Sequence, residues 1–135
     1  MLMPKKTKYR KHFRGKRRGK ATKGNKISFG DFGIQSLDNG WIDSKQIEAA
    51  RIAISRILRG EGKMWIRIFP DKVATSKPIE VRMGKGKGEP EKWVAVIRRG
   101  RILYEMEGIS EEKAKRAFRL ANAKFPLKTR LIARR

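Results

Sequence analysis

One short glycine-lysine stretch combines residue types that suit phosphate binding. It consists of Arg82, Met83, Gly84, Lys85, Gly86, Lys87 and Gly88. The glycines leave backbone N–H groups accessible, and successive N–H groups can form a concave anion site. The two lysines add positive charge, and Arg82 adds a guanidinium that can hold a phosphate or a guanine edge through two hydrogen bonds. This chemistry predicts a contact with nucleic acid.

Known nucleotide-binding motifs do not fit this stretch. A P-loop needs Gly-Lys followed by Ser or Thr at the start of a helix, but Gly88 is followed by Glu89, Pro90 and a strand-like run. A dinucleotide-binding motif needs a third glycine at a step where this chain has none. The sequence therefore predicts a loop that contacts RNA, with a flexible, solvated hairpin tip as the alternative, and no nucleotide cofactor.

Candidates for catalysis or metal binding are few. Glu105 and Glu107 lie on one face of an expected strand, but the sequence supplies no partner for acid–base or metal chemistry. They leave a magnesium-dependent nuclease as a weak alternative. His12 is the only histidine and cysteine is absent, which excludes a zinc site and disulfides. We therefore expect a protein that is not an enzyme and has no metal and no cofactor.

The N-terminal segment 1–26 is a second candidate contact, because it is rich in Lys and Arg and contains no Asp or Glu. Tyr9 and Phe13 are interleaved with these charges and can stack on bases. The tail residues that we expect to bind RNA are Lys5, Lys6, Lys8, Arg10, Lys11, His12, Arg14, Lys16, Arg17, Arg18, Lys20 and Lys23. A disordered, solubilising tail is the alternative.

The charge of the whole chain points to a polyanionic partner. Its 135 residues include 36 Lys and Arg against 13 Asp and Glu, a net charge of +23. Nucleic acid is the expected partner, and an anionic membrane surface is the second choice. We expect no membrane insertion, because no apolar run approaches the length of a membrane span. A DNA-binding architectural protein remains the alternative to an RNA-binding one.

Hydrophobic periodicity predicts a basic tail over residues 1–26 and a single α+β domain over 27–135, in which a mainly antiparallel sheet packs against two helices. Strand-like alternation covers residues 27–37, 63–69, 77–83, 92–99, 101–107 and 127–135. The fourth and fifth of these runs are expected to form a hairpin that turns at Gly100. The loop 82–91 then protrudes between two strands.

Capping signals and apolar stripes predict two helices. Asp43 and Gln46 form a capping-box pair at the start of the first helix, and Gly60 can end it after Arg59. The second helix is expected to begin at Ser110 and to end at Pro126. The two apolar stripes are Ile47, Ala50, Ile54, Ile57 and Leu58 in the first helix, and Ala114, Ala117, Phe118, Ala121 and Phe125 in the second.

One face of the first helix could carry a further contact with RNA. Arg51, Ser55 and Arg59 share this face because they are four residues apart. Two interpretations stay open. The face is either a basic ridge that binds a second stretch of RNA through Arg51 and Arg59, or a solvated surface with an ordinary Glu48–Arg51 pair.

Several segments together resemble a known protein family. They are MLMPKKTKYRKHFRG, QIEAARIAI, KMWIRIFPDK, KPIEVRMGKGKGEPEKWVAVI and GRILYEMEGISEE, which follow one another from Met1 to about Thr129. In this order they resemble the sixteenth protein of the bacterial large ribosomal subunit, the universal uL-sixteen family. The motifs RIFPDK and RMGKGKG are specific to that family, whereas the C-terminal RLIARR matches less clearly.

The resemblance implies a structural constituent of the large ribosomal subunit that binds 23S-type rRNA beside the A site. It implies that the loop from Arg82 to Gly88 points toward the peptidyl-transferase region and contacts A-site tRNA, with P-site tRNA as an open further contact. Neighbouring ribosomal proteins would be partners, and no homo-oligomer is expected. Arg82 matches an arginine that is hydroxylated in some bacteria. A cytoplasmic bacterial ribosome is the expected location, and an organelle-encoded copy stays open.

Overall fold

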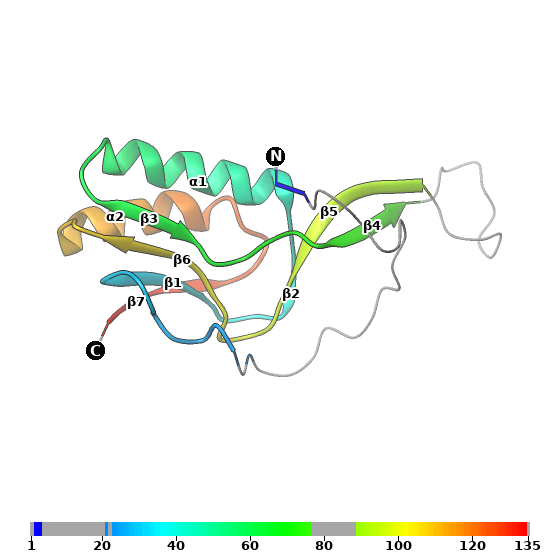
Figure 1. The fold of residues 1–135 in the computed structure, drawn as a ribbon, viewed down its shortest axis with the longest axis horizontal. Helices are drawn as coiled ribbons and strands as arrows, with labels where there is room; N and C mark the ends of the chain where they lie inside the picture. The colour runs from blue at the N-terminus through cyan, green and yellow to red at the C-terminus, as the bar shows by residue number, and fades with distance from the viewer. Residues whose placement is uncertain (1, 4–20, 22, 77–88, 135) are drawn as a thin grey trace.

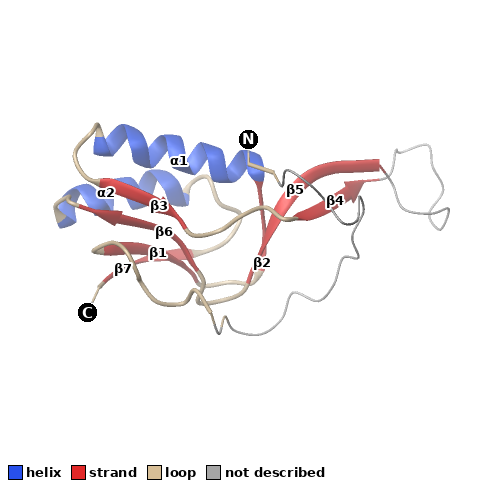
Figure 2. Cartoon of the chain, viewed as in Figure 1, coloured by secondary structure: helices blue, strands red, loops and turns tan. Residues whose placement is uncertain are grey.

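A computed structural model describes residues 2–3, 21, 23–76 and 89–134, and these residues form two helices and seven strands (Figures 1 and 2). The strands are β1 (Phe32–Ser36), β2 (Gly40–Asp43), β3 (Lys63–Ile66), β4 (Lys72–Ser76), β5 (Glu89–Ile97), β6 (Ile102–Glu107) and β7 (Thr129–Ala133). The helices are α1 (Ser44–Leu58) and α2 (Glu111–Asn122). This architecture confirms the predicted α+β class.

The strands divide into two antiparallel sheets. A four-stranded sheet has the order β3-β6-β1-β7, and a three-stranded sheet has the order β2-β5-β4. The helices α1 and α2 pack against each other and against the four-stranded sheet, with α1 touching β3 and α2 touching β7 (Figure 1). The strands β4 and β5 project at the end of the molecule opposite to α2 (Figure 1).

The core lies between the two helices and the four-stranded sheet. Tyr104 of β6 is fully buried, and its hydroxyl donates a hydrogen bond of 2.6 Å to the carbonyl of Ile47 in α1. Its ring packs against Phe125, with ring centroids 5.9 Å apart. Burial raises the pKa of the Tyr104 hydroxyl well above its usual range. The hydroxyl therefore stays protonated and remains a donor.

The predicted start of α1 is confirmed. Asp43 accepts a hydrogen bond of 2.8 Å from the backbone N–H of Gln46, whose side chain accepts one of 3.0 Å from the N–H of Asp43. The predicted stripe is buried at Ile47, Ala50, Ile54 and Leu58 and half-buried at Ile57. The helix ends at Leu58, because Arg59 already takes the left-handed conformation (φ 44°) before Gly60 does.

The start of α2 is also confirmed, since Ser110 accepts a hydrogen bond of 3.2 Å from the N–H of Lys113. Its end was predicted too late. The helix stops at Asn122, and a turn in which the Phe125 N–H donates to the Asn122 carbonyl follows. Phe125 therefore reaches the core from this turn, ahead of Pro126.

The predicted hairpin around Gly100 is wrong. The strand β5 pairs with β2 and β4, whereas β6 pairs with β1 and β3 in the other sheet. The corner residues bond to the end of β1: Gly100 donates to the carbonyl of Ser36, and Ser36 donates to the carbonyl of Arg101. An alternating pattern predicts which side chains face the core, but it does not identify the partner strand.

The region around Pro70 also differs from the prediction. The strand β3 ends at Ile66, and a second strand, β4, follows the buried Pro70 although its sequence, KVATS, has only weak alternation. The predicted strand 77–83 lies outside the described residues. The last predicted strand is confirmed as β7, which pairs with β1 at the edge of the larger sheet.

The cap at Asp43 allows a direct test of this fold. Asp43→Ala removes the oxygen that accepts the Gln46 N–H, and we expect the free energy of unfolding to fall by about 1 kcal/mol in urea denaturation. Asp43→Asn keeps an acceptor at this position and should stay within about 0.5 kcal/mol of the wild type. Equal losses for the two variants would contradict the capping role.

Candidate nucleic-acid interface

Most of the residues predicted to bind RNA lie outside the described residues. This holds for the tail residues from Lys5 to Lys20 and for the loop from Arg82 to Gly88. Lys23, Arg51 and Arg59 are described. Lys23 lies before β1, away from the helix that carries the two arginines, with Arg51 within α1 and Arg59 at its C-terminal cap. The structure does show how the two ends of the loop and the last residues of the tail are attached to the folded domain.

The anchor of the loop is the antiparallel pair β4–β5. The last described pair, Ser76 opposite Glu89, flanks residues 77–88, so the two ends of this segment are held side by side. Lys92 of β5 lies 3.7 Å from the carboxylate of Asp43, the residue that caps α1. Lys72 of β4 lies over the Trp41 ring, 5.0 Å from its centroid. These contacts connect both arms of the loop to the region where β2 meets α1.

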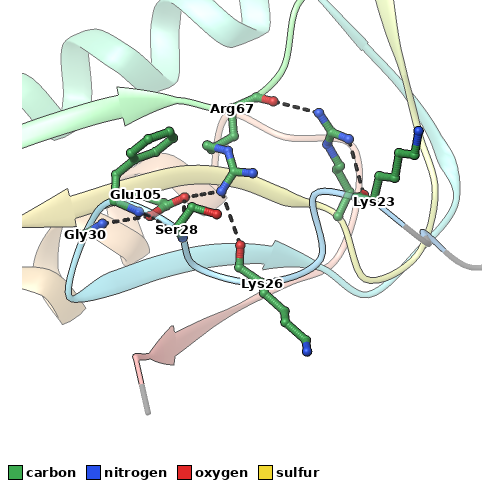
Figure 3. Close-up of polar contacts among 8 residues, drawn as sticks. Lys23, Lys26, Ser28, Gly30, Arg67 and Glu105 are labelled. Atoms are coloured by element: carbon green, nitrogen blue, oxygen red, sulfur yellow. Dashed lines mark hydrogen bonds and ion pairs between the residues drawn. The ribbon is translucent and has the colours of Figure 1, made fainter.

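The anchor of the tail is the corner between β5 and β6. The N–H of Ala21 donates to the carbonyl of Arg99 at 2.9 Å, and the N–H of Ile102 donates to the carbonyl of Gly24 at 2.7 Å. The side chain of Arg101 donates to the carbonyl of Lys23 at 3.3 Å and to that of Arg67 at 2.8 Å (Figure 3). Hydrogen bonds to backbone groups thus attach the last residues of the tail to this corner.

A buried carboxylate holds the next part of this segment. Glu105 of β6 has no exposed surface, and it accepts hydrogen bonds from the backbone N–H groups of Ser28 (3.1 Å), Phe29 (2.7 Å) and Gly30 (2.7 Å) (Figure 3). Its other oxygen also receives the guanidinium of Arg67. A buried charge is tolerated when it is paired and hydrogen-bonded in this way.

These partners shift the titration of Glu105. Burial by itself raises the pKa of this carboxyl group, but the N–H groups of Gly30 and Phe29 and the guanidinium of Arg67 outweigh burial and hold the pKa below its usual range. These partners therefore favour the ionised form of Glu105. The nearby Arg101 is also shifted: burial lowers its pKa, and the neighbouring charge of Arg67 acts in the same direction.

An aromatic stack lies next to this carboxylate. Phe29 packs on Trp65 of β3 with ring centroids 5.8 Å apart, and the Arg67 guanidinium lies over the Phe29 ring at 5.4 Å. Arg67 also donates to the carbonyl of Lys26 at 3.2 Å. One arginine therefore contacts Glu105, Lys26 and Phe29, and joins segment 23–30 to the sheet face that the helices leave free.

The weak nuclease hypothesis loses support from this geometry. The two oxygens of Glu105 already accept four donors, and Glu107 lies opposite Lys63 in the β3–β6 register. In the part of the chain that the structure describes, no three His, Cys, Asp or Glu side chains gather where they could hold a metal ion. The described helices also include none that is long and apolar enough to cross a membrane.

On α1, the structure shows the pair that the solvated interpretation assumes. The Arg51 Nε donates to both carboxylate oxygens of Glu48 at 3.1 Å, and this hydrogen bond lowers the pKa of Glu48. Ser55 is exposed, and its carbonyl accepts the N–H of Arg59 in the helix cap. Arg59 is exposed and has no hydrogen bond from its side chain to a described residue. The role of Arg51 and Arg59 in RNA binding stays a prediction.

Sequence reasoning missed the arginine network of Arg67, Arg101 and Glu105. Glu105 is flanked by two apolar residues that alternation correctly assigns to the core, and alternation then places the carboxylate on the opposite, solvated face. Three signals were available in the sequence. They are the carboxylate of Glu105 within a largely apolar strand, the glycine-rich run before β1, and the arginines Arg67 and Arg101 at strand ends. None of them identifies segment 23–30 as the cover of this face.

The described residues define a basic α+β protein in which a buried carboxylate and a pair of antiparallel strands anchor two cationic segments, which is the class of a nucleic-acid-binding protein. A family model described as ribosomal protein L16p/L10e matches residues 4–132. The chain belongs to this family, which confirms the family predicted from the sequence, while its bacterial origin stays a prediction. It is therefore a protein of the large ribosomal subunit that functions in translation and binds rRNA and neighbouring ribosomal proteins.

The buried carboxylate gives a second test. Glu105→Gln replaces the charge that three N–H groups and Arg67 bind, and the free energy of unfolding should fall by about 3 kcal/mol. Glu107→Gln is the matched control on the same strand and should stay within about 0.5 kcal/mol of the wild type. Urea denaturation measures both, and equal small losses would contradict the anchoring role of Glu105.

A comparison of the wild type with Glu105→Gln over a range of pH tests the lowered pKa of Glu105. Because the native pKa of Glu105 is lowered, its stabilising contribution is complete above the unfolded pKa of about 4.3 and is lost as the pH falls through the native pKa. The difference in unfolding free energy between the wild type and Glu105→Gln should be constant from pH 7 to about 5 and should shrink at lower pH. A difference that grows on acidification would contradict the lowered pKa.

Proposed function

We propose that this ribosomal protein helps to shape the tRNA-binding A site of a cytoplasmic bacterial ribosome and itself performs no catalysis. The loop from Arg82 to Gly88 contacts A-site tRNA, and the P-site tRNA lies within the reach of the same loop. The tail from Lys5 to Lys23 binds rRNA and fixes the protein in the subunit. Arg82 is the position that a hydroxylase would modify.

The observation that carries this proposal is the pair of antiparallel strands, β4 and β5, from which the loop starts. Antiparallel pairing of β4 with β5 brings residues 76 and 89 together, and the contacts of Lys72 and Lys92 tie this pair to Trp41 and Asp43. A thin, charged loop on a fixed base can enter crowded RNA at a defined place, because glycine allows close approach and lysine neutralises phosphate. Family membership supports RNA as the partner.

Ribosomes that carry Lys85→Ala together with Lys87→Ala test this function. We expect the protein to be incorporated in normal amounts, because the body and the tail are unchanged. We expect tRNA accommodation to slow by roughly tenfold, equal to about 1.4 kcal/mol on the barrier, because two phosphate contacts are lost. Rapid kinetics with fluorescent tRNA measures the rate.

The control is Lys115→Ala together with Lys124→Ala, which removes the same charge from two exposed positions on and after α2. This control should accommodate tRNA at the wild-type rate. A normal rate for the loop variant in fully occupied ribosomes would refute the proposed role of the loop.

A further inference from the structure

The helix-free face of the four-stranded sheet holds a broad, open hollow of about 980 Å³ at the β7 edge. Its lining residues are Asn25, Lys26, Ile27, Gln35, Arg130, Ile132, Ala133 and Arg134. Three of these described lining residues are cations, and none is a carboxylate. Arg130 and Arg134 lie outside the segments that the sequence predicts to bind RNA, whereas Lys26 is the last residue of the basic segment 1–26.

Cross-strand pairing builds the floor of this hollow. Gln35 lies opposite Arg130, and Gly33 lies opposite Ile132, so these four residues face the same side of the β1–β7 pair. The segment before β1 forms a wall by crossing Gly33. A Cβ atom at position 33 would lie 3.1 Å from Cγ1 of Ile27, so glycine allows this close approach.

A buried amide orients the central cation. Gln35, which is only 9% exposed, donates from its side-chain nitrogen to the carbonyl of Gly100 at 2.9 Å. This bond leaves the Gln35 oxygen directed at Arg130, whose Nε donates to it at 2.9 Å. The two terminal nitrogens of Arg130 have no hydrogen-bond partner among the described residues. They are the pair of donors that bind a phosphate in bidentate geometry.

The two other cations flank this guanidinium. The carbonyl of Lys26 accepts a hydrogen bond from Arg67, while its side chain extends away from Arg67 (Figure 3). Arg134 is exposed, and its backbone N–H is held by the carbonyl of Asp31 at 2.7 Å, which continues the β1–β7 pairing by one residue. Both cations are therefore attached at the backbone and free at the side chain within the described structure.

We propose that Arg130, Arg134 and Lys26, the last residue of the basic segment 1–26, form a phosphate-binding site for the backbone of rRNA, separate from the tail residues Lys5 to Lys23 and from the loop. The ligand is a polynucleotide backbone, because the hollow is open and has several cations along its length, as a chain of phosphates requires. Gln35 is a positioning residue that acts through Arg130. This inference rests on rRNA binding by the family and adds the surface that performs part of it.

Binding of the full-length protein to protein-free large-subunit rRNA, measured over a series of salt concentrations, tests the site. Affinity falls as salt rises, and Arg130→Gln should make this fall less steep. The slope of log affinity against log salt should decrease in magnitude by about 0.7 to 0.9, the value for one phosphate contact. Arg116→Gln, which removes the same charge from an exposed position on α2, should change the slope by much less. Arg134→Gln is a second variant within the site, and it should also reduce the slope.

Gln35→Met tests the positioning role. It should weaken binding in the wild-type background and have no further effect in the Arg130→Gln background, and equal losses in both backgrounds would overturn this role. Unchanged slopes for folded Arg130→Gln and Arg134→Gln proteins would overturn the site alone. If the wild-type protein itself failed to bind the rRNA, the proposed function would fall as well.

Discussion

The structure depends on the burial of one charged group, the Glu105 carboxylate, inside β6, a strand in which five of the six residues are buried. A charge without exposed surface must be compensated, and here three successive backbone N–H groups and Arg67 supply the compensation. Successive N–H groups point at one oxygen only when the chain takes a fixed path. The carboxylate therefore determines the course of residues 28–30 over the helix-free face of the sheet.

That course connects the parts of the molecule that we propose to contact RNA. The segment before β1 continues from the tail along the chain. Its residues Lys26 and Ile27 also form a wall of the basic hollow. Hydrogen bonds to Arg99 and Arg101 attach its beginning to the corner after β5, and β5 in turn forms one arm of the loop anchor. The attachment points of the tail and the loop and the walls of the hollow are thus joined through hydrogen bonds and strand pairing, on a protein whose net charge is +23.

The sequence predicted what depends on local signals. Both helix starts, the apolar stripe of α1, the strand β7 and the family follow from caps, periodicity and specific motifs, and each is confirmed. The sequence did not predict which strands pair, because alternation indicates the face of a side chain and not the neighbouring strand. The predicted hairpin at Gly100 was therefore wrong. The contacts of Glu105 with residues 28–30 and of Arg130 with Gln35 were missed for a related reason: each joins residues more than 70 positions apart in the chain.

Native-state hydrogen exchange of the amides of residues 28–30 tests most directly whether Glu105 fixes this segment. In the wild type, these three amides should exchange slowly, at rates close to those of β1 and β6. In Glu105→Gln they should exchange at least about 100-fold faster, while the amides between β1 and β6 stay protected. Equal protection of residues 28–30 in the two proteins would contradict the view that the buried carboxylate organises this face.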